Sequence, residues 1–435
     1  MRKKSPKKIT FTSSKRRTVE AEFDGGAVST DAGLLLVREA DRRLGLIRSI
    51  ARRLYDGRQE GKVRHSTETM LRQRVMALCA GWEDLNDADQ LRRDPVHQLA
   101  AGSDALASPP TLCRFENRQS RATAWAVNAE FVEQFIASYQ KPPAHLILDF
   151  DATDTPVHGQ QEGRFFHGYY DCYCFLPLYV FCGDRLLVAY LRRSNIDPAR
   201  HAAAILKLLV SRLRQAWPRT KIVFRGDSGF CRDLLLGWCD RHDVKYIVGI
   251  ARNDRLLSFG AKLMRQAERE FERSGKKQRI FGAFDYAALT WRQVRWVIMK
   301  AEHTEHGSNP RFVITNIVGD SQRLYDRRYC ARGEMENRVK EQMMLFADRV
   351  SAHRWWANQW RLLLSALAYT LMESMRRLAL AGTEMVEATV DTIRTKLVKI
   401  GAVVEIKLSL IRLHLSSYHP LQELFRHVAR ALCPG

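Results

Sequence analysis

The sequence predicts an α/β protein with a mixed sheet flanked by helices. Apolar runs of strand length begin near residue 144, and helical segments lie between them. Their order is strand, strand, strand, helix, strand, helix, strand, which is typical of an α/β layer. Residues 1–140 and 329–377 instead show apolar periodicity typical of helices. With 46% apolar residues the chain can bury a substantial core.

A chain of 435 residues is long enough for two or three domains. Five segments along the chain differ in their pattern of apolar and charged residues. We expect a helical N-terminal region (1–140), the first part of an α/β core (141–251), a β-rich insertion subdomain (252–325), further core helices (326–380) and a C-terminal helix and strand region (381–435).

The N-terminal region contains several helix start signals. Ser29-Thr30-Asp31 predicts a helix start, followed by apolar residues at helical spacing as far as Ile47. A second helix is expected over Ser66–Cys79, and another opens at Leu112. Met1–Arg17 is basic and lacks the apolar core of a signal peptide, which leaves a solubilising tail and a DNA-contacting arm as alternatives.

The core segment contains five expected strands and two expected helices. The strands are His145–Asp151, Phe175–Cys182, Leu186–Leu191, Lys221–Asp227 and Val244–Ile250, and the helices are Ala199–Trp217 and Phe230–His242. Arg252–Arg279 is dense in charged residues and interrupts this alternation of strands and helices. Strand-like pieces at Val294–Met299 and Phe312–Ile317 then favour an inserted β subdomain, and Ile406–Leu415 alternates like a strand.

The charge balance points to a polyanionic partner. Lys and Arg number 70 against 48 Asp and Glu, a net charge of +22, which favours nucleic acid and assigns a DNA-binding role to residues 1–140. A membrane surface is the rival partner, but no apolar stretch approaches the length of a bilayer span. The nine cysteines lack paired CxxC spacing, so we expect reduced thiols in a cytoplasmic protein.

Acidic residues follow two of the expected strands. Asp149 and Asp151 end the first strand and share a face, because alternate strand residues point the same way. Asp227 ends the fourth strand, and ligands of open α/β sheets gather at that edge. Glu336 lies on a helix far downstream. Carboxylates of this kind bind Mg²⁺, and paired ions promote in-line attack on phosphate.

Each of these residues also has a simpler interpretation. An Asp after a strand is often a helix cap or turn residue, which applies to Asp149 and Asp227. Glu336 is at the spacing for a helical ion pair with Lys340. Spacing alone leaves the acidic trio undecided, and it leaves Asp149 and Asp151 as alternative first ligands.

Several motifs together resemble the DDE transposases of bacterial insertion sequences, in the branch called DDE transposase domain group 1. The motifs are Asp31-Ala-Gly-Leu-Leu, Gly81-Trp-Glu-Asp-Leu-Asn, Leu148-Asp-Phe-Asp-Ala-Thr-Asp, His158-Gly-Gln-Gln-Glu-Gly, Tyr190-Leu-Arg-Arg-Ser-Asn, Arg225-Gly-Asp-Ser-Gly-Phe and the block from Tyr329 to Glu341. The resemblance covers nearly the whole chain. It implies a ribonuclease-H-like core with a β-rich insertion before the last acidic residue.

The resemblance also implies roles for individual residues. Asp151, Asp227 and Glu336 match the catalytic, metal-binding trio, which would hold two Mg²⁺ ions, with Mn²⁺ as a substitute. Asp149 is a further candidate ligand. Tyr329 and Arg332 stand at the spacing of the family's tyrosine–arginine–glutamate–lysine signature. Some relatives carry its lysine where this chain has Met343, and Lys340 is the nearest lysine.

Family enzymes cut double-stranded DNA at the terminal inverted repeats of their element and join the 3′ ends to target DNA. The resemblance therefore implies a homodimer in a synaptic complex, associated with the bacterial nucleoid. Expected DNA contacts are Tyr329, Arg332, Lys340, Arg192, Arg193, Asn195, Trp291 and Trp296. Core packing competes as the explanation of the two tryptophans. A nuclease or domesticated relative without integration activity, and a non-enzymatic DNA-binding protein, are the alternative functions.

Overall fold

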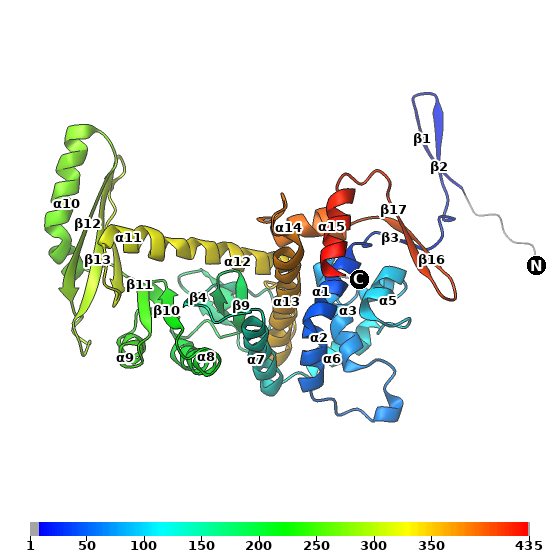
Figure 1. Cartoon of the computed structure of the whole chain (residues 1–435), viewed down its shortest axis with the longest axis horizontal. Helices are drawn as coiled ribbons and strands as arrows, with labels where there is room; N and C mark the ends of the chain where they lie inside the picture. The colour runs from blue at the N-terminus through cyan, green and yellow to red at the C-terminus, as the bar shows by residue number, and fades with distance from the viewer. Residues whose placement is uncertain (1–7, 434–435) are drawn as a thin grey trace, which may run out of the picture. The chain divides into compact units, whose positions relative to one another are not determined.

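The computed structural model describes residues 8–433 and divides into two units (Figure 1). We call residues 120–343 and 347–366 the sheet unit. Residues 1–119, 344–346 and 367–435 form the terminal unit, so the two ends of the chain fold together. This arrangement differs from the prediction of separate regions over residues 1–140 and 381–435.

The sheet unit is built on a nine-stranded mixed sheet. Its strands lie in the order β12 (Gln278–Tyr286), β13 (Arg295–Thr304), β15 (Arg311–Thr315), β11 (Lys245–Ile250), β10 (Lys221–Gly226), β4 (His145–Ala152), β8 (Leu178–Cys182) and β9 (Arg185–Tyr190), and β14 (Gly307–Ser308) pairs with β13. The expected mixed α/β sheet is confirmed. A small sheet of β5 (Thr155–Pro156), β7 (Cys172–Phe175) and β6 (Phe165–His167) interrupts the expected Phe175–Cys182 strand.

Three central strands are parallel, and the helices between them explain why. β10 runs parallel to both β4 and β11, whereas β8 and β9 form an antiparallel extension beside β4. Parallel neighbours require crossover connections. Helix α8 (Ala202–Ala216) leads into β10, and α9 (Asp233–Arg241) leads from β10 to β11. The carboxyl ends of β4 and β10 therefore lie at the same edge.

The two faces of the sheet are covered differently. Apolar side chains such as Leu148, Phe150 and Phe224 point to one face, where they join a core with α7 (Arg121–Ala137), α8, α9 and α10 (Asp254–Ser274). The opposite face carries α11 (Ser321–Arg323), a π-helical turn (Leu324–Tyr329), a 3₁₀ turn (Cys330–Arg332) and α12 (Gly333–Met344). Figure 1 shows this second set passing across the row of strands from β13 toward β4, on the side away from α8 and α9.

The prediction of a separate β-rich subdomain over residues 252–325 is wrong. β15 pairs antiparallel with β11, so β15, β13 and β12 continue the main sheet. The charged stretch after Arg252 is mostly helix α10, which lies across β12 and β13 (Figure 1). Only a narrow stripe of α10, including Leu256, Gly260 and Ala267, is buried. Its polar surface obscured the helical periodicity.

The terminal unit joins a helical bundle to short β elements. Its helices are α1 (Leu34–Leu44), α2 (Leu46–Arg53), α3 (Thr67–Cys79), α4 (Ala88–Leu91), α5 (Pro95–Ala101), α6 (Pro109–Asn117), α14 (Val390–Ile393) and α15 (Gln422–Leu432). The expected Ser66–Cys79 helix is confirmed, with Ser66 as its cap. Helix α13 (Trp355–Met375) spans the boundary between the units.

The β elements of the terminal unit depart from the helical prediction for residues 1–140. β1 (Ile9–Ser14) and β2 (Arg17–Ala21) form an antiparallel hairpin whose residues are all exposed. β3 (Val28–Ser29) adds to the hairpin of β16 (Ala402–Ile406) and β17 (Ile411–Leu415). The basic segment predicted over Met1–Arg17 is therefore hairpin from Ile9 onward, and residues 1–7 lie outside the described residues.

Two of the sequence motifs meet at one buried carboxylate in the terminal unit. Asp31 accepts hydrogen bonds from the Trp82 indole at 2.6 Å and from His97 at 2.9 Å, and Lys399 lies 2.9 Å away. Burial alone would raise the pKa of Asp31, but these donors outweigh it and lower the pKa to about 2. The motifs at Asp31 and at Gly81-Trp82 thus tie the two chain ends together.

Across the described residues, no helix has the length and apolarity needed to cross a bilayer. The nine cysteines are all unpaired, and four of them are buried.

Candidate active site

The site begins at the adjoining ends of two parallel strands. β4 and β10 pair in register from Lys221 beside His145 to Gly226 beside Phe150. One further step in this register sets Asp227 beside Asp151. Phe150 between the acidic positions of β4 points into the core, which leaves Asp149 and Asp151 on the opposite face. Two carboxylates from distant parts of the sequence therefore meet at one sheet edge.

The helical segment above this edge supplies the third carboxylate and a cation. Arg332 Nη1 lies 3.4 Å from Asp151 Oδ2, and its Nη2 donates to Glu336 Oε1 at 2.9 Å. Arg332 and Glu336 are one helical turn apart. The π-helical and 3₁₀ turns before α12 lead the chain to this position over the sheet. Arg332 therefore joins the first and third members of the acidic trio.

The surroundings of Asp151 disfavour the charged form of its carboxylate. Burial is the main cause that raises its pKa to about 6, and the negative charges of Asp227 and Glu336 add to the rise. Arg332 acts in the opposite direction. Burial would lower the pKa of Arg332, but Asp151, Asp227, Tyr329 and Glu336 together raise it. All three carboxylates therefore lie within electrostatic range of one guanidinium.

Asp149 has a different environment from Asp151, although both share one strand face. Its carboxylate forms a two-point ion pair with Arg225, in which Nε contacts Oδ1 and Nη2 donates to Oδ2 at 2.7 Å. Both side chains are buried, and Arg225 also donates to the Arg328 carbonyl at 2.6 Å. Arg225 already neutralises Asp149, so this geometry favours Asp151 as the first ligand of a cation.

The donor set suits a hard divalent cation in chemistry and charge. Asp151 is mostly buried, and a bound cation would offset both the burial and the neighbouring negative charges that raise its pKa. Within residues 8–433, no group of three or more His, Cys, Asp or Glu side chains is arranged closely enough to hold a metal ion as it stands. Arg332 occupies the space between Asp151 and Glu336. The Glu336 side chain is 52% exposed, so it has room to turn toward an incoming ion.

Tyr329 packs against the second acidic strand end. A β-carbon added at Gly249 would lie 2.5 Å from the Tyr329 hydroxyl and 3.3 Å from the Asp227 carbonyl carbon. Burial raises the pKa of Tyr329, and Asp227 contributes to the rise. Glycine at position 249 of β11 therefore gives the tyrosine space beside Asp227. The structure brings Tyr329 and Arg332 of the predicted set to the acidic trio.

The prediction that Arg192 contacts DNA is wrong for this structure. Its side chain is buried, and the guanidinium donates to the carbonyl oxygens of Leu176, Pro198 and Arg200 at 2.7–2.9 Å. Burial lowers its pKa to about 10. Arg192 thus holds together the loop between β9 and α8 and fixes it to Leu176, which follows β7. A sequence does not distinguish an arginine that caps backbone carbonyls from one that faces solvent.

Three other predicted DNA contacts are accessible. Arg193, Asn195 and Lys340 are exposed, and Lys340 lies one turn beyond Glu336 on α12. Arg193 lies 5.9 Å from the centre of the Phe165 ring. Their contact with DNA stays a prediction.

The two tryptophans lie on a distant part of the sheet. Paired residues connect Trp296 through Thr315 and Ile247 to Arg225 and Asp149. Four strand spacings separate the ends of this row, roughly 19 Å. Trp291 packs against Tyr286 with ring centres 5.5 Å apart. Both tryptophans are half-buried and lie far from the acidic trio, so DNA contact by either remains a prediction.

Tyr170 is near the acidic trio but was absent from the sequence candidates. Burial raises its pKa to about 12, and the charges of Asp154, Asp151 and Asp227 add to the rise. It lies in the turn after β6, within a segment rich in aromatic residues. The sequence does show several aromatic residues close together in this segment, but the nearby histidines and glycines make that pattern difficult to recognise.

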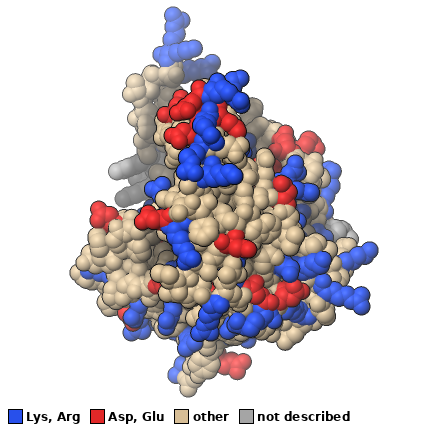
Figure 2. Space-filling model, turned by 90° about the vertical axis from the view of Figure 1, so that its left-hand side faces the viewer, with Lys and Arg blue, Asp and Glu red and all other residues tan. Residues whose placement is uncertain are grey.

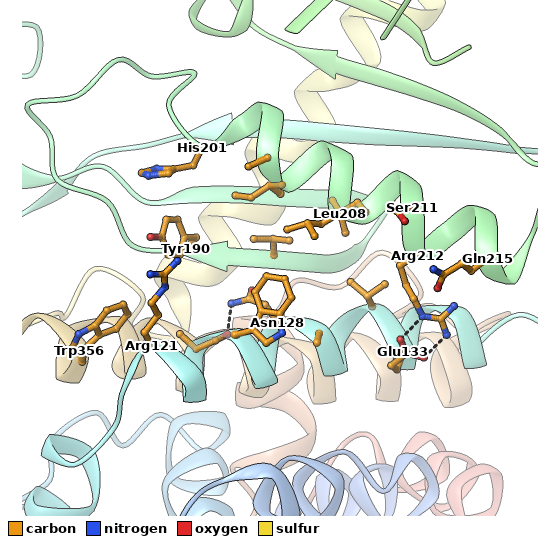
Figure 3. Close-up of a pocket in the computed structure, with 18 residues that line it drawn as sticks. Arg121, Asn128, Glu133, Tyr190, His201, Leu208, Ser211, Arg212, Gln215 and Trp356 are labelled. Atoms are coloured by element: carbon orange, nitrogen blue, oxygen red, sulfur yellow. Dashed lines mark hydrogen bonds and ion pairs between the residues drawn. The ribbon is translucent and has the colours of Figure 1, made fainter. Parts of the chain in front are cut away.

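A separate cavity of about 430 Å³ lies between α7 and α8, over β9 (Figure 3). Its lining is mainly apolar, with Trp356 and Arg121 near one end and the Arg212–Glu133 ion pair near the other (Figure 3). None of its lining residues belongs to the acidic trio. We therefore place the chemistry at the strand ends rather than in this cavity.

Basic side chains are spread over the surface rather than confined to one band in the view of Figure 2, where acidic side chains lie among them. Charge alone therefore does not mark a single DNA track on that face. A second cavity, of about 720 Å³, adjoins the Asp149–Arg225 pair. Arg323, Arg327 and Arg328 line it together with Asp320 and Glu334, so charges of both signs lie beside this pair.

Comparison with known proteins gives a family match over nearly the whole chain. The family model described as Transposase DDE domain group 1 matches residues 11–434. A solved structure, the cryo-EM structure of a piggyBac transposase synaptic complex with hairpin DNA, has a TM-score of 0.45 and 10% sequence identity. That match covers 84% of this chain and 79% of the other. Comparison with curated proteins gives no match.

Proposed function

Because the chain belongs to the Transposase DDE domain group 1 family, we propose that it cuts DNA at element terminal inverted repeats and joins the 3′ ends to target DNA. The family implies a polynucleotidyl transferase or nuclease. The single observation that carries the finer proposal is the convergence of Asp151, Asp227 and Glu336 around Arg332.

Mg²⁺ is the proposed cofactor, with Mn²⁺ as a substitute and two ions as the expected number. Asp151, Asp227 and Glu336 would hold them, since carboxylate oxygens are the preferred ligands of these hard cations. A bound divalent ion would lower the pKa of an attacking water or 3′-hydroxyl and stabilise the leaving oxygen. Asp149 is the weaker candidate ligand, because Arg225 already neutralises it.

The protein's own groups would position the substrate around this chemistry. Arg332 is placed to exchange its carboxylate partners for a DNA phosphate once a cation binds, because both ligands carry negative charge. Tyr329 fills the space above Gly249 and holds the backbone at Asp227 in place. Lys340, Arg193 and Asn195 are exposed and available for phosphate contacts at the same unit.

We further propose that the core is ribonuclease-H-like. The strands lie in the order β9-β8-β4-β10-β11. β8 is antiparallel to β4, whereas β10 and β11 are parallel to β4, and this arrangement supports the assignment. The position of acidic residues at the ends of β4 and β10 supports it as well. A homodimer bound to two element ends, and a DNA-binding role for the terminal unit, belong to the same proposal.

A strand-joining assay tests the function. The substrate is a donor plasmid carrying the gene with its flanking DNA, mixed with a target plasmid, purified protein and Mg²⁺. We expect excision at inverted repeats and covalent 3′-end joining, both abolished by Asp227→Ala. Cleavage without joining would indicate the nuclease alternative. Cleavage that survives Asp227→Ala would contradict the proposed active site.

A further inference from the structure

An aromatic hairpin lies close to the acidic trio. We define it as residues 164–175, comprising β6, β7 and the turn between them. Phe166 and Tyr173 face each other across the strands with ring centres 5.6 Å apart, and they are 52% and 47% exposed. Tyr169 at the turn is 85% exposed. So many exposed rings in one short segment need a physical explanation, because exposed apolar clusters commonly mark binding sites.

The hairpin is attached where the strand of Asp151 ends. β4 stops at Ala152, and Thr155 of β5 then pairs with Phe175 of β7. The Thr153 amide also donates to the Pro177 carbonyl at 3.3 Å. Tyr170 in the turn lies close enough to Asp151 and Asp227 for their charges to act on it. The base of the hairpin therefore adjoins the strand end that carries Asp151.

Hydrogen bonds hold the hairpin and the segment before it in place. Glu162 accepts from the Trp355 amide at 3.0 Å, and its own amide donates to the His353 carbonyl at 2.9 Å. The Ser194 hydroxyl donates to the Phe165 carbonyl at 2.9 Å. These anchors come from other parts of the sheet unit. The exposed rings are consequently presented on a fixed support, which reduces the entropy lost on binding.

Positive charge accompanies the rings. The Arg164 guanidinium lies 4.6 Å from the centre of the Tyr173 ring, and the Arg193 guanidinium lies 5.9 Å from that of Phe165. Aromatic faces combined with arginines are the usual means of holding unpaired nucleotides, since bases stack on rings and phosphates pair with guanidinium groups. An apolar protein partner would leave these arginines uncompensated.

We propose that the aromatic hairpin stacks an unpaired DNA base next to the phosphate held at the acidic trio, with Tyr169 as the main stacking ring. Arg164 and Arg193 contact the phosphates on either side of that base. The inference deepens the proposed function, because it names the state of the DNA that this site takes. It places the unpaired nucleotide at β6–β7.

The test uses the full chain with Asp227→Asn, so that DNA binds without being cut. One probe is a duplex oligonucleotide with a two-nucleotide bulge containing 2-aminopurine, and the other is the fully paired duplex. We expect tighter binding of the bulged probe and quenching of 2-aminopurine on binding. Adding Tyr169→Ala should remove the preference and weaken bulge binding by roughly tenfold, whereas Tyr169→Trp should retain both.

Trp125→Ala provides a matched control, because Trp125 is an exposed aromatic residue of the same unit that lies on α7. It should leave the preference unchanged. Equal binding of both probes by the parent protein, or a preference that survives Tyr169→Ala, would overturn the inference. Strand joining is measured separately on the wild-type chain. If the parent protein shows no preference for the bulged probe while the wild-type chain joins strands, only this inference is refuted, whereas stacking without cleavage or joining by the wild-type chain refutes the proposed function.

Discussion

Arg225 pairs with Asp149 through two contacts inside the sheet unit, while Asp151, two residues along the same strand face, is paired with the more distant Arg332. The two carboxylates therefore differ in role although they look alike in sequence. Asp149 is part of the internal structure, and Arg225 also joins it to the Arg328 carbonyl under the helical segment.

Replacing Arg225 by Met should destabilise the protein by about 3–5 kcal/mol, because it leaves the Asp149 carboxylate buried without a counter-charge. Urea unfolding monitored by circular dichroism measures the change. The double variant Asp149→Leu with Arg225→Met should recover much of the loss. An Arg225→Met protein as stable as the parent would show that the ion pair has no structural role.

Asp151→Asn should stabilise the metal-free protein at pH 7. The folded pKa of about 6 lies above the ordinary value of 3.8, so the protonated form is the favoured one in the fold. The stabilisation of the fold by the protonated Asp151 carboxyl is complete below pH 3.8 and is lost as the pH rises through 6. Removing the charge should raise the free energy of unfolding by up to about 3 kcal/mol. Unfolding curves between pH 4 and 8 test this, and an unchanged or lowered stability at pH 7 would contradict it.

Asp31→Asn should act with the opposite sign in the terminal unit. Here the folded pKa of about 2 lies below 3.8, so the carboxylate stabilises the fold above pH 3.8 and the contribution is lost as the pH falls through 2. We expect a loss of about 2 kcal/mol at pH 7. The difference from wild type should shrink between pH 4 and 2. A pH-independent difference would mean that Asp31 acts through packing rather than charge.

Substitutions at Arg192 and Arg193 should change different properties. The first should change the stability of the protein, and the second its DNA binding. Arg192→Met removes donors to three backbone carbonyls and should lower the midpoint of thermal unfolding. Arg193→Gln should leave that midpoint unchanged and weaken DNA binding with a smaller salt dependence. Thermal unfolding and fluorescence anisotropy at several salt concentrations measure both. The reverse pattern would restore Arg192 as a DNA contact.

The central strands can be predicted from the sequence because each is a continuous apolar run with clear ends. β4, β10 and β11 lie within a residue or two of the predicted ranges, and the carboxylates at the ends of β4 and β10 follow from them. Periodicity does not say which strands are neighbours. For that reason β12, β13 and β15 were assigned to a separate subdomain, although they extend the main sheet.

Other features lacked a sequence signal for physical reasons. The β1–β2 hairpin exposes every residue, so it has no inward apolar face to mark it. Buried arginines such as Arg192 and Arg225 resemble surface arginines until their partners are known. The electrostatic effect of Asp227 on Tyr170 joins residues that lie far apart in the sequence, which local patterns do not encode.

Iron-directed cleavage of the polypeptide tests the central claim most directly. Hydrogen peroxide oxidises Fe²⁺ bound in the proposed Mg²⁺ site and releases hydroxyl radicals that cut the nearby backbone, while ascorbate regenerates the Fe²⁺. The fragments are mapped by mass spectrometry. Convergence of the trio predicts cuts near residues 151, 227 and 336, suppressed by excess Mg²⁺ and by Asp227→Ala. Cuts confined to other segments, or cuts at these positions that neither Mg²⁺ nor Asp227→Ala suppresses, would contradict a shared divalent-cation site.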